Sequence, residues 1–200
     1  RHVTPQFTWD WDHLKYIQKH LYQIEHNEID KLMIFCPPRH GKTEMTTIHF
    51  PAYLLQQNPK RRIVIAAYNQ ILANKFSRRV RKIVESRVVL NHERTAVEEW
   101  ETLAGGSIRA VGIAGGITGQ GSDIFIIDDP IKPDEADTSE LKRDNINNWY
   151  LNTVQSRLNN PMTGGIIVIM QRTHENDLAG FLMERESKGM EKWERVIVPA

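Results

Sequence analysis

Several features that would narrow the possible functions are scarce in this 200-residue sequence. The single cysteine, Cys36, cannot form a disulfide within the chain, which indicates a reducing compartment. No apolar run approaches the roughly 18 residues of a membrane-spanning helix, and no signal peptide opens the chain. Since the net charge is only +1, attraction to a polyanion must come from a local basic cluster. We therefore expect a cytoplasmic protein with no membrane partner.

The residues that are present have the composition of a soluble domain with a sizeable core, 40% hydrophobic and 26% charged. The sequence contains no repeat, low-complexity tract or linker, so we expect residues 1–200 to form one domain. The chain begins at Arg1 and ends in WERVIVPA, which reads as a strand leading into further residues. We therefore expect these residues to be a piece of a longer protein.

Short apolar runs alternate with helical patterns along the chain. The expected strands are residues 31–35, 61–68, 123–128 and 164–171, and residues 98–112 read as a β-hairpin that turns at Gly105 and Gly106. This alternation is typical of an α/β fold with a mainly parallel sheet and helices on both faces.

Apolar residues spaced three and four apart predict the helices. The first two expected helices are residues 10–26 and 43–55. The third is capped by Asn69 and has Leu72, Phe76, Val80 and Ile83 on its core face. The fourth is capped by Asp137 and Glu140 and runs to about Leu158, and the fifth starts at about Thr173 and carries Leu178, Phe181 and Leu182. Pro51 should kink the second helix or disfavour helical geometry at Phe50.

The stretch IFCPPRHGKTEM, residues 34–45, joins an expected strand to an expected helix through a rigid, basic turn. Backbone N–H groups at a helix start attract phosphate, so this order of elements builds an anion-binding site. Gly41 lets the backbone approach the phosphates, Lys42 is the cation for the β and γ oxygens, and Thr43 offers a hydroxyl to Mg²⁺. Cys36 replaces the first glycine of the usual P-loop pattern, so the motif is incomplete. A basic helix start without a ligand is the alternative.

Two carboxylates end the buried strand in IFIIDDP. A nucleotide hydrolase uses such a pair to hold Mg²⁺ and to orient the attacking water. Asp128 would then take the metal and Asp129 the water. The alternative is a pair of turn-forming aspartates, with Pro130 ending the strand.

A third strand also ends in polar residues, in IIVIMQRTHENDLAG. Gln171 is placed to touch the γ-phosphate or the attacking water, and Arg172 and His174 begin the next element. The strand should lie beside the P-loop strand, so Gln171 would respond to phosphate release and couple it to the following helix. An ordinary N-cap at Thr173 is the alternative.

CPPRHGKTEM, IIDDPIKPDEAD and MQRTHENDLAG, in this order, resemble the ATPase domain of the large terminase subunit, the DNA-packaging motor of tailed bacteriophages and prophages. The resemblance covers nearly the whole chain and implies an additional-strand (ASCE) P-loop NTPase fold with ATP and Mg²⁺ as ligands. The residues that it places around the phosphates are Pro38, Arg39, His40, Gly41, Lys42, Thr43 and Glu44. Arg39 would add a second positive charge there or sense the loss of the phosphates. The nuclease domain usual in the family has no room within residues 1–200, so we expect no cutting activity.

The sequence departs from the family pattern in two places. The water-orienting carboxylate is commonly a glutamate, whereas Asp129 is shorter by one methylene, and Glu135 is the alternative base. The glycine-rich loop that often carries an arginine has Gln120 instead. A trans-acting arginine would then be Arg109 or Arg157, although an ordinary structural role is the alternative for each.

The start FTWDWDHLKYIQ resembles the family segment that contributes to the adenine pocket. Trp9 and Trp11 are therefore candidates to stack on the base, and His13 is a candidate for a polar contact. Anchoring of the first helix in the core is the alternative.

The clearest basic cluster is NKFSRRVRK. Its cations Lys75, Arg78, Arg79 and Lys82 lie on one helix face, away from the apolar stripe, where they can contact DNA phosphates. A solvated face or a subunit contact is the alternative.

The resemblance implies a motor that translocates double-stranded DNA into a procapsid in the host cytoplasm. Its implied partners are the portal protein and the small terminase subunit, and it would act as a homo-oligomeric ring. The alternatives are another P-loop motor of helicase type and a nucleotide-dependent assembly module without turnover. Lys42 together with Asp128 and Asp129 favours turnover.

Overall fold

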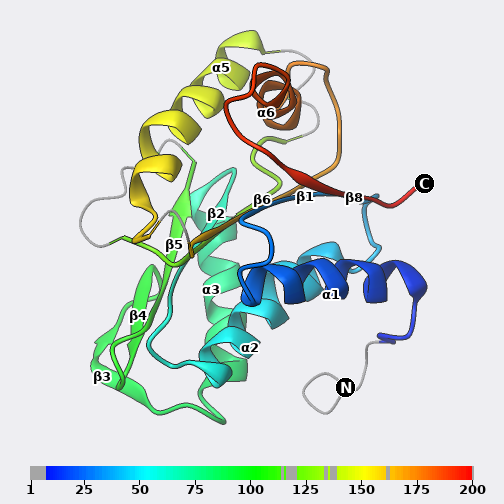
Figure 1. Ribbon diagram of the computed structural model, residues 1–200. Helices are drawn as coiled ribbons and strands as arrows, with labels where there is room; N and C mark the ends of the chain where they lie inside the picture. Colours follow the sequence, from blue (N-terminus) through cyan, green and yellow to red (C-terminus); the bar gives the residue numbers. More distant parts are fainter. Residues whose placement is uncertain are drawn as a thin grey trace.

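The computed structural model describes residues 8–113, 115, 121–132, 135, 139–160 and 163–199 (Figure 1). Its strands form one eight-stranded sheet in the order β3-β4-β5-β2-β6-β7-β1-β8. The strands are β1 (Lys31–Phe35), β2 (Arg62–Ala67), β3 (Leu90–Thr95), β4 (Glu99–Thr102), β5 (Ser107–Gly112), β6 (Ile124–Asp128), β7 (Gly165–Met170) and β8 (Glu194–Ile197). β4 runs antiparallel to β3 and β5, and the other pairings are parallel, which confirms the expected mainly parallel sheet.

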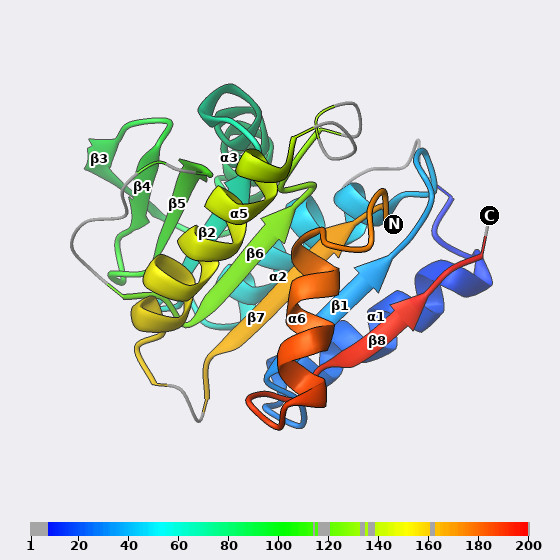
Figure 2. The ribbon, with the colours of Figure 1, turned by 90° about the horizontal axis from the view of Figure 1, so that it is seen from above.

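Helices cover both faces of this sheet, as Figure 2 shows. One face carries α1 (Asp12–Glu25), α2 (Phe50–Gln57) and α3 (Gln70–Val84), and the other carries α5 (Glu140–Trp149) and α6 (Leu178–Ser187). The π-helical segments η1 (Glu44–His49) and η2 (Tyr150–Val154) and the 3-10 turn η3 (Gln155–Arg157) adjoin α2 and α5. Within the described ranges, no helix is both long and apolar enough to cross a membrane.

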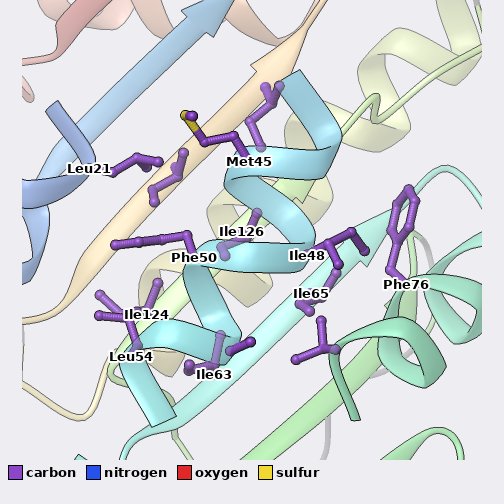
Figure 3. Packing of buried hydrophobic residues seen from close by; sticks show 14 of the residues in the cluster. Leu21, Met45, Ile48, Phe50, Leu54, Ile63, Ile65, Phe76, Ile124 and Ile126 are labelled. Carbon is purple, nitrogen blue, oxygen red and sulfur yellow. The ribbon is translucent and has the colours of Figure 1, made fainter. Parts of the chain in front are cut away.

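The strands separate two hydrophobic cores, because successive residues of a strand point to opposite faces. In β1, Leu32 and Ile34 join the core under α1, α2 and α3, whereas Met33 joins the core under α5 and α6. Figure 3 shows the first core, where the helix after β1 packs over Ile65 of β2 and Ile126 of β6. Burial on both faces explains the near-continuous apolar runs of these strands.

Most predicted elements are present, and α1, β1, β2, β6 and β7 match their predicted bounds to within two residues. The hairpin forms from β4 and β5, and Gly105 in its turn has a φ of 92°, which favours glycine. Asn69 caps α3 by accepting a hydrogen bond from the Leu72 N–H at 2.9 Å. β3 is not predicted, because its residues after Leu90 are mostly exposed and lack apolar alternation.

One of the two expected effects of Pro51, loss of helical geometry at Phe50, is wrong, whereas a kink at Pro51 stays a prediction. Phe50 has helical dihedral angles, φ −64° and ψ −49°, and its N–H donates to the Met45 carbonyl five residues back. Pro51 lies in the first turn of α2, where its missing N–H is not needed. A wide π turn therefore replaces the expected loss of helix.

The helix predicted from about Thr173 begins at Leu178 instead. Asp177 is its N-cap, since the carboxylate accepts from the Gly180 N–H at 2.9 Å. Thr173 as the N-cap is therefore wrong. A buried acidic cap outcompetes the earlier threonine because it also accepts from the Arg172 guanidinium at 2.9 Å.

Two smaller predictions about helices need adjustment. Ser139 caps α5 by accepting from the Lys142 N–H at 3.3 Å, and the predicted cap Asp137 lies outside the described residues. In α3 the buried side chains are Ala73, Phe76, Ser77, Val80 and Val84. Leu72 and Ile83 are only partly buried, at the margins of this face.

Candidate functional site

Parallel strands end level with one another at one edge of the sheet. Phe35 of β1 pairs with Met170 of β7. Asp128 of β6 pairs with Ile169 of β7 on one side and with Ala67 of β2 on the other. The residues that follow these strands therefore converge, as at the ligand-binding edge of other open α/β sheets. They enclose a cleft of about 560 Å³.

The cleft gathers many of the residues predicted to bind nucleotide. Its lining includes Pro38, Arg39, Gly41, Lys42, Thr43 and Glu44 from the P-loop, Asp129 after β6, and Gln171 after β7. Tyr68 and Lys132 also line it, although sequence reasoning missed both. The sequence feature that could have identified them is their position, because each follows a parallel strand that ends at this edge.

The P-loop backbone contains two left-handed residues, Arg39 with φ 63° and Gly41 with φ 79°. Glycine adopts this conformation freely, whereas for arginine it costs roughly 1 kcal/mol. A Cβ atom at residue 41 would lie 3.2 Å from Leu14 Cδ2, so packing against α1 also favours glycine. The turn is therefore held in shape by its contacts with the rest of the domain.

α1 supports this turn through His13. The His13 Nε2 atom lies 2.9 Å from the His40 carbonyl oxygen, and the two rings meet edge to face. His40 Nδ1 lies 2.8 Å from the Pro38 carbonyl oxygen. His13 thus touches the P-loop without lining the cleft, and its contact with adenine stays a prediction.

Lys42 connects the P-loop to the end of β6. Its Nζ lies 3.0 Å from Asp129 Oδ1, and its side chain is only 8% exposed, against 41% for Asp129. Asp129 has a left-handed φ of 45°, and its N–H donates to the Ile169 carbonyl at 2.8 Å. This strained turn directs the Asp129 carboxylate toward the P-loop lysine.

Asp128 lies buried beside the helix that follows the P-loop. Ile124 and Ile126 face that helix, and strand alternation puts Asp128 on the same face. Thr47 Oγ1 donates to Asp128 Oδ2 at 2.5 Å, and Thr43 Oγ1 donates to Oδ1 at 3.4 Å. Thr47 was missed by sequence reasoning, and its signal was a spacing of four residues from Thr43.

The pKa of Asp128 is raised to about 7, first because its carboxyl is buried and second because the Asp129 charge is close. Hydrogen bonds from Thr47 and the charge of Lys42 oppose this shift. Mg²⁺ prefers a carboxylate and hydroxyl oxygens together with substrate phosphates and water. Asp128 and Thr43 supply such donors, so the residues present fit Mg²⁺. The described residues contain no cluster of three or more His, Cys, Asp or Glu side chains that would hold a metal alone.

An ion pair ties α3 to the P-loop helix. Arg79 Nη1 and Nη2 each lie 2.6 Å from an oxygen of Glu44. This bidentate geometry is stronger than a single contact. The prediction of one exposed face with four cations therefore needs correction, since Arg79 is engaged within the domain. The basic face of α3 consists of Lys75, Arg78 and Lys82, which are all exposed.

Gln171 follows β7, and β7 lies directly beside β1, as predicted. The next residue, Arg172, donates from Nε to Asp177 Oδ2 at 2.9 Å, and its guanidinium lies 5.7 Å from the centre of the Phe35 ring. Because Asp177 caps α6, the segment after Gln171 is joined to α6 by an ion pair. This link is compatible with coupling, which stays a prediction.

Glu135, the alternative base, is not among the residues that line the cleft. Its Oε1 atom lies 2.8 Å from Lys142 Nζ and 3.9 Å from Lys132 Nζ. Two lysines therefore surround its charge. The placement favours Asp129 as the base, and both assignments stay predictions.

The tryptophans near the start of the described chain do not line the cleft. Trp9 packs edge-on against His49, with ring centres 4.8 Å apart, and against the first core. Trp11 is 60% exposed, just before α1. The packing of Trp9 agrees with an anchor for α1, and the stacking of either ring on adenine stays a prediction.

The two candidate arginines also lie away from the cleft lining. Arg109 Nη2 lies 2.9 and 2.8 Å from the two carboxylate oxygens of Glu99, across the β4–β5 pair. The Arg157 carbonyl accepts from the Ser122 N–H at 2.7 Å, before the start of β6 and hence at the opposite edge of the sheet. Either arginine would have to act on a neighbouring subunit, and this role stays a prediction.

Comparison with solved structures identifies relatives of this fold. The HK97 bacteriophage large terminase is 17% identical with a TM-score of 0.58, over 90% of this chain and 38% of that one. The large terminase of a thermophilic bacteriophage, in complex with ATP-γ-S, is 11% identical with a TM-score of 0.56, over 90% and 44%. A Dbp5 variant from S. cerevisiae bound to Gle1 and IP6 is 10% identical with a TM-score of 0.55, over 89% and 45%. The chain spans less than half of each of these proteins.

Comparison of the sequence itself is more specific than the fold. No protein with a curated description matches it. Residues 33–199 match the family model described as terminase large subunit, T4likevirus-type, N-terminal. The matched range contains the P-loop, both aspartates after β6 and the segment after β7. The chain therefore belongs to the terminase large subunit family and corresponds to the N-terminal part of that subunit.

Proposed function

We propose that this chain is the ATP-hydrolysing motor domain of a viral DNA-packaging terminase, which translocates double-stranded DNA into a procapsid. The observation that carries the proposal is the meeting of the P-loop residues Lys42 and Thr43 with the two aspartates that end β6. A phosphate-binding turn, a cation and paired carboxylates are the parts that phosphoryl transfer to water requires. We assign residues 1–200 to a single domain of this kind.

The proposed reaction converts ATP and water into ADP and phosphate. Lys42 and the P-loop N–H groups bind the β and γ oxygens, and Lys42 exchanges its contact with Asp129 for them. The Asp129 carboxylate orients the water and accepts its proton while the water oxygen bonds to the γ-phosphorus. The bond from that phosphorus to the bridging oxygen breaks, and its electron pair stays on ADP. Mg²⁺, when bound by Thr43 and Asp128, neutralises phosphate charge.

The proposed assembly is a homo-oligomeric ring docked on the portal protein in the host cytoplasm, together with the small terminase subunit. Duplex DNA would meet the basic face of α3, because Lys75, Arg78 and Lys82 present three exposed cations. The membership in the terminase family supports these partners.

A phosphate-release assay with the purified chain tests the proposal. We expect release from ATP that requires Mg²⁺, and binding of ATP-γ-S in a calorimetric titration. Binding without release, with or without duplex DNA, would favour the assembly module that lacks turnover. Absence of both binding and release would overturn the proposal. Strand separation by the full-length protein would instead favour a motor of helicase type.

A further inference from the structure

The charges around the cleft are unevenly compensated. Among the described residues that line it, the cations are Arg39, Lys42 and Lys132. Lys42 is paired with Asp129, and Glu44 is already paired with an arginine of α3. The lining therefore carries more positive charge than its own carboxylates neutralise. This excess suits a ligand with several negative charges.

Lys132 contributes to this excess from the segment after β6. Ile131 is buried in the core under α5 and α6 and fixes the chain one residue earlier. Lys132 Nζ lies 5.4 Å from the centre of the Tyr68 ring, a cation–π contact that restrains the ammonium and leaves its N–H groups able to donate. Glu135 lies 3.9 Å from it and is closer, at 2.8 Å, to Lys142. Lys132 is thus positioned but only weakly neutralised.

We propose that Lys132 binds the terminal phosphate of the nucleotide from the side opposite Lys42, an inference that rests on the proposed function. Lys42 follows β1, whereas Lys132 follows β6, with β7 between them. Two strand spacings amount to about 10 Å, which two long lysine side chains can bridge through one phosphate group. Lys132 lines the same cleft as Asp129, where the terminal phosphate has to be attacked.

This position makes Lys132 selective for a triphosphate. The α- and β-phosphates stay at the P-loop, where Lys42 and the backbone amides serve them. Only the terminal phosphate extends toward β6 and β2, and its equatorial oxygens carry charge in the transition state. A lysine already held on the Tyr68 ring stabilises that charge without reorganising.

Equilibrium titration of the purified chain with ATP-γ-S and with ADP tests this role. In Lys132→Met the affinity for ATP-γ-S should fall roughly tenfold, the size of one lost charged hydrogen bond. The affinity for ADP should change by less than about twofold. Lys132→Arg, which keeps the charge, should retain most of the preference for ATP-γ-S. Lys15→Met is the control, because this exposed lysine of α1 does not line the cleft, and both affinities should match the parent.

Tyr68 provides a second variant that leaves the lysine in place. Tyr68→Phe keeps the aromatic face and should bind both nucleotides as the parent does. Tyr68→Ala removes the face that holds the ammonium, and it should lose part of the ATP-γ-S affinity while ADP binding stays unchanged. A thermal melt of each variant separates this effect from unfolding.

The results of these titrations distinguish the role of Lys132 from the proposed motor function. If Lys132→Met loses ATP-γ-S and ADP affinity equally, or loses neither, Lys132 does not bind the terminal phosphate, and the motor function stands. If the parent chain binds neither nucleotide, the proposed function and the role of Lys132 are both overturned.

Discussion

Lys42 and Asp129, separated by 87 residues in the sequence, form an ion pair of 3.0 Å across the cleft. The pair joins the P-loop lysine to the carboxylate that we assign as the base. Substrate phosphates are the natural competitor for the lysine, so nucleotide binding would release the carboxylate to orient water. We therefore expect the pair to suppress the base until a nucleotide arrives.

Lys42→Ala should abolish hydrolysis and weaken nucleotide binding. The β and γ oxygens lose their point charge, and hydrogen bonds to charged groups contribute about 1.5–3 kcal/mol. Phosphate release and ATP-γ-S titration measure the two effects. Lys15→Ala, at an exposed lysine of α1 that pairs with Asp12, is a suitable control. Hydrolysis by Lys42→Ala near the parent rate would remove the P-loop assignment.

Asp129→Asn should bind ATP-γ-S but stop turnover, because an amide cannot accept the proton of the attacking water. Glu135→Gln is the matched comparison, since Glu135 is the other candidate base and lies outside the cleft lining. We expect its rate to stay near that of the parent. Normal turnover in Asp129→Asn combined with loss in Glu135→Gln would reverse the assignment.

Thr47→Val should raise the Mg²⁺ concentration needed for half-maximal activity by roughly tenfold, as removal of groups that orient metal ligands commonly does. Thr47 donates to Asp128 Oδ2 at 2.5 Å, so the variant loses a hydrogen bond that favours the charged carboxylate. Thr47→Ser keeps the hydroxyl and should restore the parent titration. An unchanged Mg²⁺ dependence in Thr47→Val would limit Thr47 to a packing role.

Neutralising Lys75, Arg78 and Lys82 together should weaken duplex binding and flatten its dependence on salt. Each lost phosphate contact reduces the slope of log affinity against log salt by about 0.9. Arg79→Gln is the contrasting variant, because its guanidinium is paired with Glu44. It should leave the slope unchanged and lower the free energy of unfolding by about 1 kcal/mol. Equal slopes for the parent and the triple variant would make the basic face a solvated surface or a subunit contact.

Gln171→Ala should leave ATP affinity within about threefold of the parent and reduce DNA packaging by the full-length protein more than it reduces hydrolysis. The side chain lines the cleft, and the following Arg172 is bonded to the cap of α6, so we expect loss of the amide to remove a contact with the γ-phosphate. Both rates are measured on the same variant. A preserved ratio of packaging to hydrolysis would exclude the coupling role.

Local patterns in the sequence were sufficient for most of the elements and for the polar residues that follow the central strands. Apolar runs predict β1, β2, β6 and β7 because strands buried on both faces need apolar residues at every position. The stretch around Gly41 and Lys42 predicts a P-loop because its backbone and charge requirements are met within a few consecutive residues. Parallel order then predicts that the polar residues after β6 and β7 meet the P-loop at one edge.

Only the tertiary structure decided which polar groups pair across that edge. Asp128 takes its hydrogen bonds from Thr43 and Thr47, and Arg79 turns from the basic face to Glu44, because the helix after the P-loop packs against both β6 and α3, which lie far from it in the sequence. Long side chains choose among several partners, and the choice depends on distances of a few ångströms that no sequence spacing sets.

The tertiary structure also decided where α6 begins and which lysine after β6 reaches the cleft. The cap of α6 falls at Asp177 because Arg172 reaches it there, and a sequence pattern gives no reason to prefer it over Thr173. Lys132 enters the cleft because the buried Ile131 and the Tyr68 ring position it. Sequence determines which residues can form helices, strands and a phosphate-binding turn, since those preferences are local. Packing determines which charges meet, since the Coulomb energy depends on separation in space.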